Sequence, residues 1–149
     1  MANDPVLGML GLARRAGKMA FGDDLVREMC AARKARCVFV ASDAGVSIAK
    51  KAAQYAQRAN VPCVTLPQDK DALGAAIGKN GCAVCAVSDI GMANAAVQKL
   101  AGMDGAYAAQ AELLADKNTR IQSRRGKKKQ KTAGPERAAS GADRSSQKN

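Results

Sequence analysis

Three short apolar runs, separated by segments with helical spacing, constrain the fold of this chain most. The longest reads CVFVASD from Cys37 to Asp43, and the others cover Val61–Leu66 and Cys82–Val87. Continuous apolar runs rich in β-branched residues are typical of strands buried on both faces. Because such strands need helices on both sides of their sheet, the alternation predicts a three-layer α/β/α sandwich with the first run at its centre.

Residues that start and stop helices mark the segments around these runs. Asp4 and Pro5 predict the start of a first helix, which Gly17 ends. A short strand is expected at Lys18–Phe21, followed by a helix that Asp23 or Asp24 caps and that reaches Arg33. Further helices are predicted from Ser47 to Ala59, Asp69 to Ile77, Ser88 or Asp89 to Leu100, and Asp104 or Gly105 to near Ala115.

Charge divides the chain near residue 116. Residues 1–116 hold 13 basic and 11 acidic side chains, a balance of +2, whereas residues 117–149 hold 11 and 2, a balance of +9. The second segment has hardly any large apolar residue, so burial cannot offset the entropy lost on ordering it. We therefore expect a folded domain over residues 1–116 and a flexible, disordered basic tail over residues 117–149. Its densest cations are Arg124, Arg125, Lys127, Lys128, Lys129 and Lys131.

Such a tail attracts polyanions, for example nucleic acid or anionic lipid. The alternative interpretation is a solubilising tail whose affinity for polyanions is incidental.

Several kinds of chemistry are disfavoured by what the sequence lacks. It contains no His, which removes the commonest general base and every triad that uses imidazole. Its five cysteines stand among apolar neighbours, as expected of buried thiols in a reducing cytoplasm. The Cys82–Cys85 pair lies in a predicted strand without further metal ligands, so we interpret it as core packing. No dinucleotide or P-loop fingerprint and no membrane-spanning apolar stretch are present.

We therefore expect no enzymatic activity, cofactor, metal or small-molecule substrate. A cytoplasmic, monomeric protein without a membrane partner is the corresponding expectation.

Two groups of charged residues allow both a structural and a functional interpretation. Asp23 and Asp24 cap a helix by default, but after Gly22 they could also accept hydrogen bonds from guanine while helix amides hold a phosphate. Arg14, Arg15 and Lys18 follow the first helix, where they either complement its dipole or contact phosphate directly.

Four separated motifs carry a family resemblance. They read GLARRAGKMAFGDDLVREMC, CVFVASDAG, DALGAAIGK and AVSDIGMANAAVQKL, and they occur in order between about residues 5 and 101. Together they resemble the YlxQ-type bacterial RNA-binding proteins of the kink-turn-binding superfamily of ribosomal proteins. The resemblance implies an α/β/α sandwich around a four-stranded mixed sheet, no catalysis, and binding of a sharply bent RNA internal loop.

The resemblance also implies which residues contact RNA. In the family, the glycine-led start of the second helix enters the bent groove and reads tandem G·A pairs, and a loop after the LGxAxG segment packs on an extruded base. The corresponding positions here are Gly22, Asp23, Asp24 and Arg27, then Gly78, Lys79 and Asn80. The loop of Ser42, Asp43 and Ala44 is a weaker candidate on the same side.

One departure from the family pattern concerns phosphate contact. Ribosomal members have Asn, Glu and Lys two, three and six residues after the glycine, where this chain has Asp24, Leu25 and Glu28. Arg27, Arg33 and Lys34 compensate for the missing cation if their side chains reach the same groove.

The sequence thus predicts a non-catalytic protein that binds structured RNA, ribosomal RNA included, with the tail adding electrostatic affinity. Two alternatives remain: a substrate-binding subunit of an RNA-modifying enzyme, and a protein-interaction module with an acidic partner.

Overall fold

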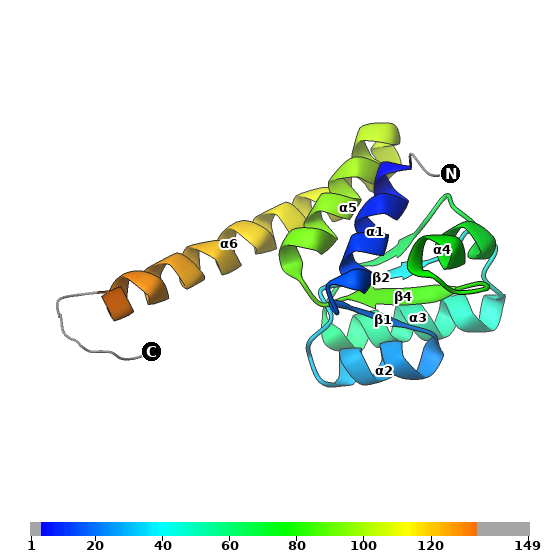
Figure 1. Ribbon diagram of the computed structural model, residues 1–149, viewed down its shortest axis with the longest axis horizontal. Coiled ribbons are helices and arrows are strands. Elements are labelled where there is room, and N and C mark those ends of the chain that lie inside the picture. The colour runs from blue at the N-terminus through cyan, green and yellow to red at the C-terminus, as the bar shows by residue number, and fades with distance from the viewer. Residues whose placement is uncertain (1–3, 134–149) are drawn as a thin grey trace. The chain divides into compact units, whose positions relative to one another are not determined.

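The computed structural model describes residues 4–133, with side chains as far as Arg125 (Figure 1). Within these residues the elements follow one another in the order α1 (Pro5–Arg15), β1 (Met19–Phe21), α2 (Asp23–Ala31), β2 (Cys37–Val40), α3 (Val46–Ala59), β3 (Cys63–Thr65), α4 (Lys70–Ile77), β4 (Val84–Val87), α5 (Ile90–Met103), the 3-10 helix η1 (Gly105–Tyr107) and α6 (Ala108–Ala133). The predicted alternation of strands and helices is confirmed, and the predicted ends differ by a few residues except in the last helix.

The four strands form one mixed sheet in the order β1-β4-β2-β3. Strand β2 runs parallel to β3 and antiparallel to β4, and β4 runs antiparallel to β1. All four residues of β2 are buried, as its continuous apolar sequence predicted for a central strand. The mixed four-stranded sheet that the family resemblance implied is therefore confirmed.

Helices cover both faces of the sheet. Figure 1 shows α2 and α3 on one face and α1, α4 and α5 on the other. Between the sheet and the α2–α3 layer lies a cluster of small and medium-sized side chains that includes Val26, Val38 and Ala56. Phe39, Leu73 and Leu100 are also fully buried. The predicted three-layer sandwich is confirmed, and its core consists mostly of Ala, Val, Leu and Ile.

Helix starts follow the predicted caps with one exception. Asp4 Oδ1 accepts hydrogen bonds from the Val6 and Leu7 amides at 2.9 and 3.1 Å. Asp69 and Asp89 cap α4 and α5 in the same way. The prediction that Asp23 or Asp24 caps α2 is wrong, because the cap position is Gly22 and no side chain bonds to the first amides. Both carboxylates therefore lie in the first helical turn.

The cysteines are free thiols, as predicted, but they are not all fully buried. Cys30, Cys37, Cys82 and Cys85 are buried, whereas Cys63 at the start of β3 is half-buried. Burial, and less strongly the neighbouring Cys82, raises the pKa of the Cys85 thiol well above its usual range. The Cys82–Cys85 pair thus packs in the interior as uncharged thiols, as predicted.

The last helix is longer than predicted. Helix α6 continues to Ala133, so its predicted end near Ala115 is wrong. The flexibility expected of the basic tail over residues 117–149 stays a prediction. Ala111 and Leu114 are buried in its first turns, which provide the costly helix nucleus. Lys, Arg and Gln then extend the helix at little cost per residue. Residues 134–149 lie outside the described residues.

The chain divides into two compact units, residues 1–115 and 116–149. In the part of the chain that is described, no helix is long and apolar enough to cross a membrane.

Candidate functional site

The sheet topology brings four loops to one edge. Strands β1, β2 and β3 end there and β4 begins there, because β4 is antiparallel to both of its neighbours. Two hydrogen bonds fix the loops after β1 and β2 beside the start of β4: the Gly22 amide donates to Val84 O at 3.0 Å, and the Ala41 amide donates to Ala83 O at 2.9 Å. We call this side of the sheet the entrance edge, because the first turn of α2 opens from it.

Gly22 sets the direction in which α2 leaves β1. Its φ of 87° and ψ of 158° lie in a region that is essentially restricted to glycine. A Cβ atom built at this position has no neighbour within 4 Å, so the backbone conformation, not crowding, requires glycine here. The exposed glycine leaves space in front of the first amides of α2.

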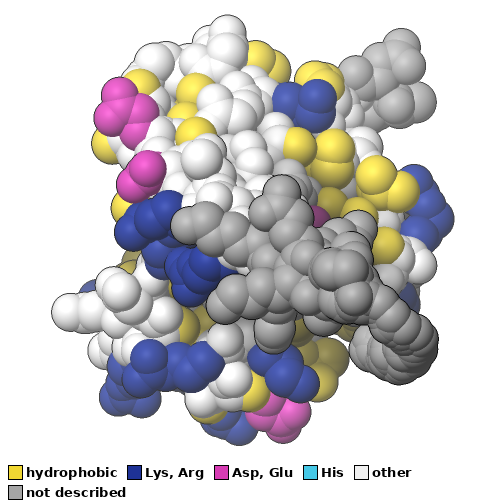
Figure 2. Space-filling view, turned by 90° about the vertical axis from the view of Figure 1, so that its left-hand side faces the viewer, with side chains coloured by type: hydrophobic (Ala, Val, Ile, Leu, Met, Phe, Trp, Pro, Cys, Tyr) yellow, Lys and Arg dark blue, Asp and Glu magenta, His cyan; other side chains and the backbone are white. Residues whose placement is uncertain are grey.

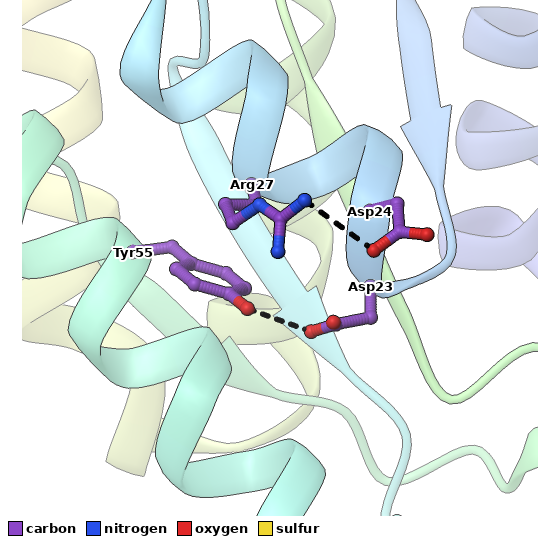
Figure 3. A network of polar contacts seen from close by, with 4 residues as sticks. All are labelled: Asp23, Asp24, Arg27 and Tyr55. Carbon is purple, nitrogen blue, oxygen red and sulfur yellow. Dashed lines mark hydrogen bonds and ion pairs between the residues drawn. The ribbon is translucent and has the colours of Figure 1, made fainter.

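Two carboxylates flank this space and are held differently (Figure 3). The Tyr55 hydroxyl of α3 donates a 2.9 Å hydrogen bond to Asp23 Oδ1. That hydrogen bond, with a smaller contribution from desolvation, raises the pKa of Tyr55. Asp24 is exposed and lies 3.5 Å from Arg27 Nη2 in an ion pair along α2. Asp23 is therefore fixed by the neighbouring helix, whereas Asp24 remains accessible to a ligand.

Phe21 joins the start of α2 to the loop between α4 and β4. The Lys79 ammonium lies 4.7 Å from the centroid of the Phe21 ring, and the Arg14 guanidinium carbon lies 4.9 Å from it. Arg14 Nε is buried and has no hydrogen-bond partner among the described residues. Since the negative face of an aromatic ring attracts cations, Phe21 holds two positive charges beside Gly22.

The loop after β2 also belongs to the entrance edge. Asp43 Oδ1 accepts a 2.8 Å hydrogen bond from the Lys70 amide, and Lys70 O accepts one of 3.1 Å from the Cys82 amide. The loop of Ser42, Asp43 and Ala44 is thereby connected to the segment that precedes β4. It lies at the same end of the strands as Gly22, and its contact with RNA stays a prediction.

Most of the predicted site residues lie together, and two do not. Gly22, Asp23, Asp24, Arg27 and the Gly78–Asn80 loop are grouped at the entrance edge. Arg33 and Lys34 lie beyond the other end of α2, which at nine residues is about 14 Å long. They therefore do not supply the missing cation at the entrance.

The six tail cations lie in α6, which belongs mainly to the second compact unit. Arg124 and Arg125 are exposed. For Lys127, Lys128, Lys129 and Lys131 the structure describes the helical backbone but not the side chains.

Sequence reasoning missed Tyr55 and Phe21 and left the role of Arg14 open. Tyr55 is 32 residues from its partner Asp23, so no local pattern relates them. Phe21 offered a weak indication, since it is one of only two phenylalanines and directly precedes Gly22.

The grouped residues provide hydrogen-bond acceptors, helix amides and cations around an open backbone turn. Helix amides and cations attract phosphate, and carboxylates accept hydrogen bonds from base edges. Within the described residues no group of three or more His, Cys, Asp or Glu side chains is arranged to hold a metal ion. The edge therefore has the composition of a nucleic-acid interface.

The α/β/α fold and the composition of the entrance edge indicate a protein with a nucleic-acid interface. Sequence comparison identifies the family. A model of the Ribosomal protein L7Ae/L30e/S12e/Gadd45 family matches residues 4–97, and the chain belongs to this family.

Two curated relatives have the same name. The RNA-binding protein YlxQ of Bacillus subtilis (strain 168) is 36% identical over 92 residues, covering 62% of this chain and 91% of that protein. The RNA-binding protein YlxQ of Enterococcus faecium is 38% identical over 60 residues, covering 40% of this chain and 58% of that protein.

Solved structures share the fold. A protein of unknown function from Bacillus halodurans C has a TM-score of 0.59 and 29% identity, covering 63% of this chain and 94% of that one. The Giardia lamblia 15.5kD RNA binding protein has a TM-score of 0.54 and 19% identity, covering 72% of this chain and 93% of that one. The second likeness concerns the fold alone.

Proposed function

We propose that this protein is a non-catalytic RNA-binding protein whose entrance edge recognises a sharply bent, kink-turn-like RNA. Membership of the L7Ae family and the names of the two YlxQ relatives support RNA as the partner. Structured RNA of the ribosomal kind fits a reader that recognises shape with few aromatic side chains.

The observation that carries this proposal is the junction at Phe21. Gly22 begins α2 and Lys79 belongs to the α4–β4 loop, and both meet at this one ring, with the Lys79 ammonium 4.7 Å from its centroid. The two segments that contact RNA in the family are thus joined in this chain by a direct contact. A bent RNA presents two closely spaced backbones and an open groove, which such a double contact fits.

The residues at the edge have different roles in the proposal. The α2 amides and the cations held by Phe21 contact phosphate and position the RNA, while the accessible Asp24 carboxylate accepts hydrogen bonds from guanine in the groove. Tyr55 is a positioning residue, because it fixes the Asp23 carboxylate through their 2.9 Å hydrogen bond. The cationic C-terminal segment adds affinity without selectivity.

Charge reversal at Asp24 tests this proposal. Full-length Asp24→Lys is compared with Glu112→Lys, which reverses the charge of an exposed acid in α6, outside the residues grouped at the entrance edge. We expect Asp24→Lys to reduce the preference for a kink-turn RNA over a straight duplex at least tenfold. Glu112→Lys should change this preference less than twofold, in fluorescence anisotropy titrations with both RNAs.

Gly22→Trp should also abolish the preference, because its side chain fills the space before the α2 amides. If Asp24→Lys weakens binding of both RNAs equally, or if the wild-type chain shows no preference, the proposed recognition is wrong.

A further inference from the structure

The sheet edge opposite the entrance edge is strongly basic. Strands β1, β2 and β3 begin there and β4 ends there. Figure 2 looks onto this side, and Lys and Arg side chains gather in the lower part of the view, where α2 and α3 end. We call five cations at this edge the basic edge, four of them in the segments before β1 and β2 and the last in the final turn of α3: Lys18, Arg33, Lys34, Arg36 and Arg58.

Backbone hydrogen bonds place the basic edge around the end of β4. The Ser88 amide donates to Lys18 O, and the Arg36 amide donates to Val87 O, both at 2.8 Å. Met19 and Cys37 pair with the same residue, Val87, from its two sides. Lys18 and Arg36 thus stand two strands apart, about 10 Å in the plane of the sheet.

The charge of the basic edge is not neutralised within the described residues. The Arg27–Asp24 and Arg120–Asp116 ion pairs include none of its members. Its nearby acids are few: Asp89 is engaged by the Met92 amide at 2.9 Å, and Glu28 shares a shallow hollow with Lys34. The entrance edge instead mixes both signs, with Asp23, Asp24, Asp43 and Asp69 near Arg27, Lys70 and Lys79.

The backbone conformation of Arg33 is a second, independent observation about the basic edge. Its φ of 60° is left-handed, a conformation that a residue with a long side chain adopts only with strain. Glycine or asparagine would end α2 there with less strain. An exposed cation at a strained position suggests a use for its charge.

The chemistry of the basic edge favours a polyanion over a protein partner. The large exposed apolar side chains among the described residues are Leu12, Leu25, Val46, Met103 and Leu113, and of these a single one, Leu25, lines the hollow that Glu28 and Lys34 share. Protein interfaces need an apolar core, whereas contacts to a nucleic-acid backbone come mostly from Arg and Lys.

We infer that the basic edge binds the phosphate backbone of a second RNA segment, separate from the segment at the entrance edge. This inference rests on the proposed RNA-binding function. The two edges lie at opposite ends of the four strands, about 14 Å apart along α2, so Lys18 and Arg36 face a different RNA segment from the one that Gly22 faces. The protein therefore bridges two parts of a folded RNA.

Removing three exposed cations tests the inference in the full-length chain. The edge variant carries Lys18→Gln, Arg33→Gly and Lys34→Gln, of which Arg33→Gly also relaxes the backbone. The control variant carries Lys50→Gln, Lys51→Gln and Lys99→Gln, which remove the same charge from exposed positions of α3 and α5. Both are titrated with a straight RNA duplex and a kink-turn RNA at several salt concentrations, after circular dichroism has shown that both are folded.

We expect the edge variant to bind the straight duplex about tenfold more weakly at low salt. The slope of log K against log salt should flatten by about 0.7–0.9 for each lost phosphate contact. The control should change less than twofold. Immobilised kink-turn RNA should capture a labelled duplex through the wild-type chain and several-fold less through the edge variant.

The outcomes separate this inference from the proposed function. The inference is overturned if the edge and control variants lose equal affinity for the straight duplex, or if the edge variant captures as much duplex as the wild-type chain. This holds even where a kink-turn preference is observed. A loss of duplex affinity in the edge variant but not in the control variant supports the inference, even where the wild-type chain shows no kink-turn preference.

Discussion

Gly22 shows how much a single residue contributes to the entrance edge. Its φ of 87° is strained for any residue with a side chain, whereas Gly45, at the start of α3, has a φ of −61° and equally open surroundings. We expect Gly22→Ala to lower the free energy of unfolding by about 1–3 kcal/mol. Gly45→Ala should not lower it, because alanine adopts this conformation without strain and restricts the unfolded chain. Urea denaturation of both variants checks this, and equal effects would contradict it.

Asp4, which caps the start of α1, makes the free energy of unfolding depend on pH. Desolvation opposes its charge, but hydrogen bonds from Gln68, Leu7 and Val6 outweigh it and lower the pKa of Asp4 below its ordinary value of 3.8. The stabilisation is therefore complete above the ordinary pKa and is lost as the pH falls through the lowered one.

Replacing Asp4 tests this linkage. Asp4→Ala removes the cap and should cost about 1 kcal/mol at pH 7. The difference from wild type should shrink at pH 3 and below, in urea denaturation at several pH values. A difference independent of pH would show that the charge of Asp4 contributes nothing.

The hydrogen bond from Tyr55 to Asp23 should affect both the stability of the protein and its preference for kinked RNA. Tyr55→Phe keeps the ring but removes the 2.9 Å hydrogen bond to Asp23. We expect a loss of about 0.5–1.5 kcal/mol in the free energy of unfolding. A several-fold lower preference for kinked RNA should accompany it, because Asp23 is then free to rotate. Unchanged preference with lowered stability would show a purely structural role.

At the scale of elements, the close approach of α4 to the loop before β4 positions Lys79. A Cβ atom on Gly74 would lie 2.6 Å from Gly81 Cα, and Gly74 O already accepts a 2.8 Å hydrogen bond from the Lys79 amide. Gly74→Ala should displace this loop, cost about 1–3 kcal/mol and weaken kink-turn preference.

Gly8→Ala is the matched control for Gly74→Ala. It changes a helical glycine of α1 that has no neighbour within 4 Å of the added atom. It should leave RNA preference unchanged and raise the free energy of unfolding by up to about 1 kcal/mol, because alanine is the better helix former. Thermal melts together with RNA titrations distinguish the two variants.

At the scale of the whole molecule, we expect the C-terminal cations to contribute affinity for every RNA and the entrance edge to determine the preference for kinked RNA. Replacing Arg124, Arg125, Lys127, Lys128, Lys129 and Lys131 by Gln removes six charges while keeping good helix formers in α6. We expect weaker binding to every RNA, with a salt dependence flattened by about 0.7–0.9 per lost phosphate contact. Preference for kinked over straight RNA should be unchanged. A selective loss of kinked RNA would assign recognition to this segment.

The elements of the fold were largely predictable because their information is local. Apolar β-branched runs predicted β2, β3 and β4, and Asp4, Asp69 and Asp89 begin the helices that they were expected to begin. Local reasoning was wrong where the helix start or end depends on backbone conformation or on a preceding nucleus. Gly22 takes the cap position that the aspartates were expected to take, and α6 continues far beyond Ala115.

The amino-acid sequence by itself determined the layered fold, the charge division and the segments that resemble a family of RNA-binding proteins, because periodicity, composition and motif spacing are properties of neighbouring residues. Only the tertiary structure decided which charges act together. Antiparallel pairing of β4 with β1 placed Lys79 beside Phe21, and the packing of α2 against α3 placed Tyr55 beside Asp23. The same pairing set Arg33 and Lys34 beside Lys18 at the other edge, since strand direction fixes which loops meet.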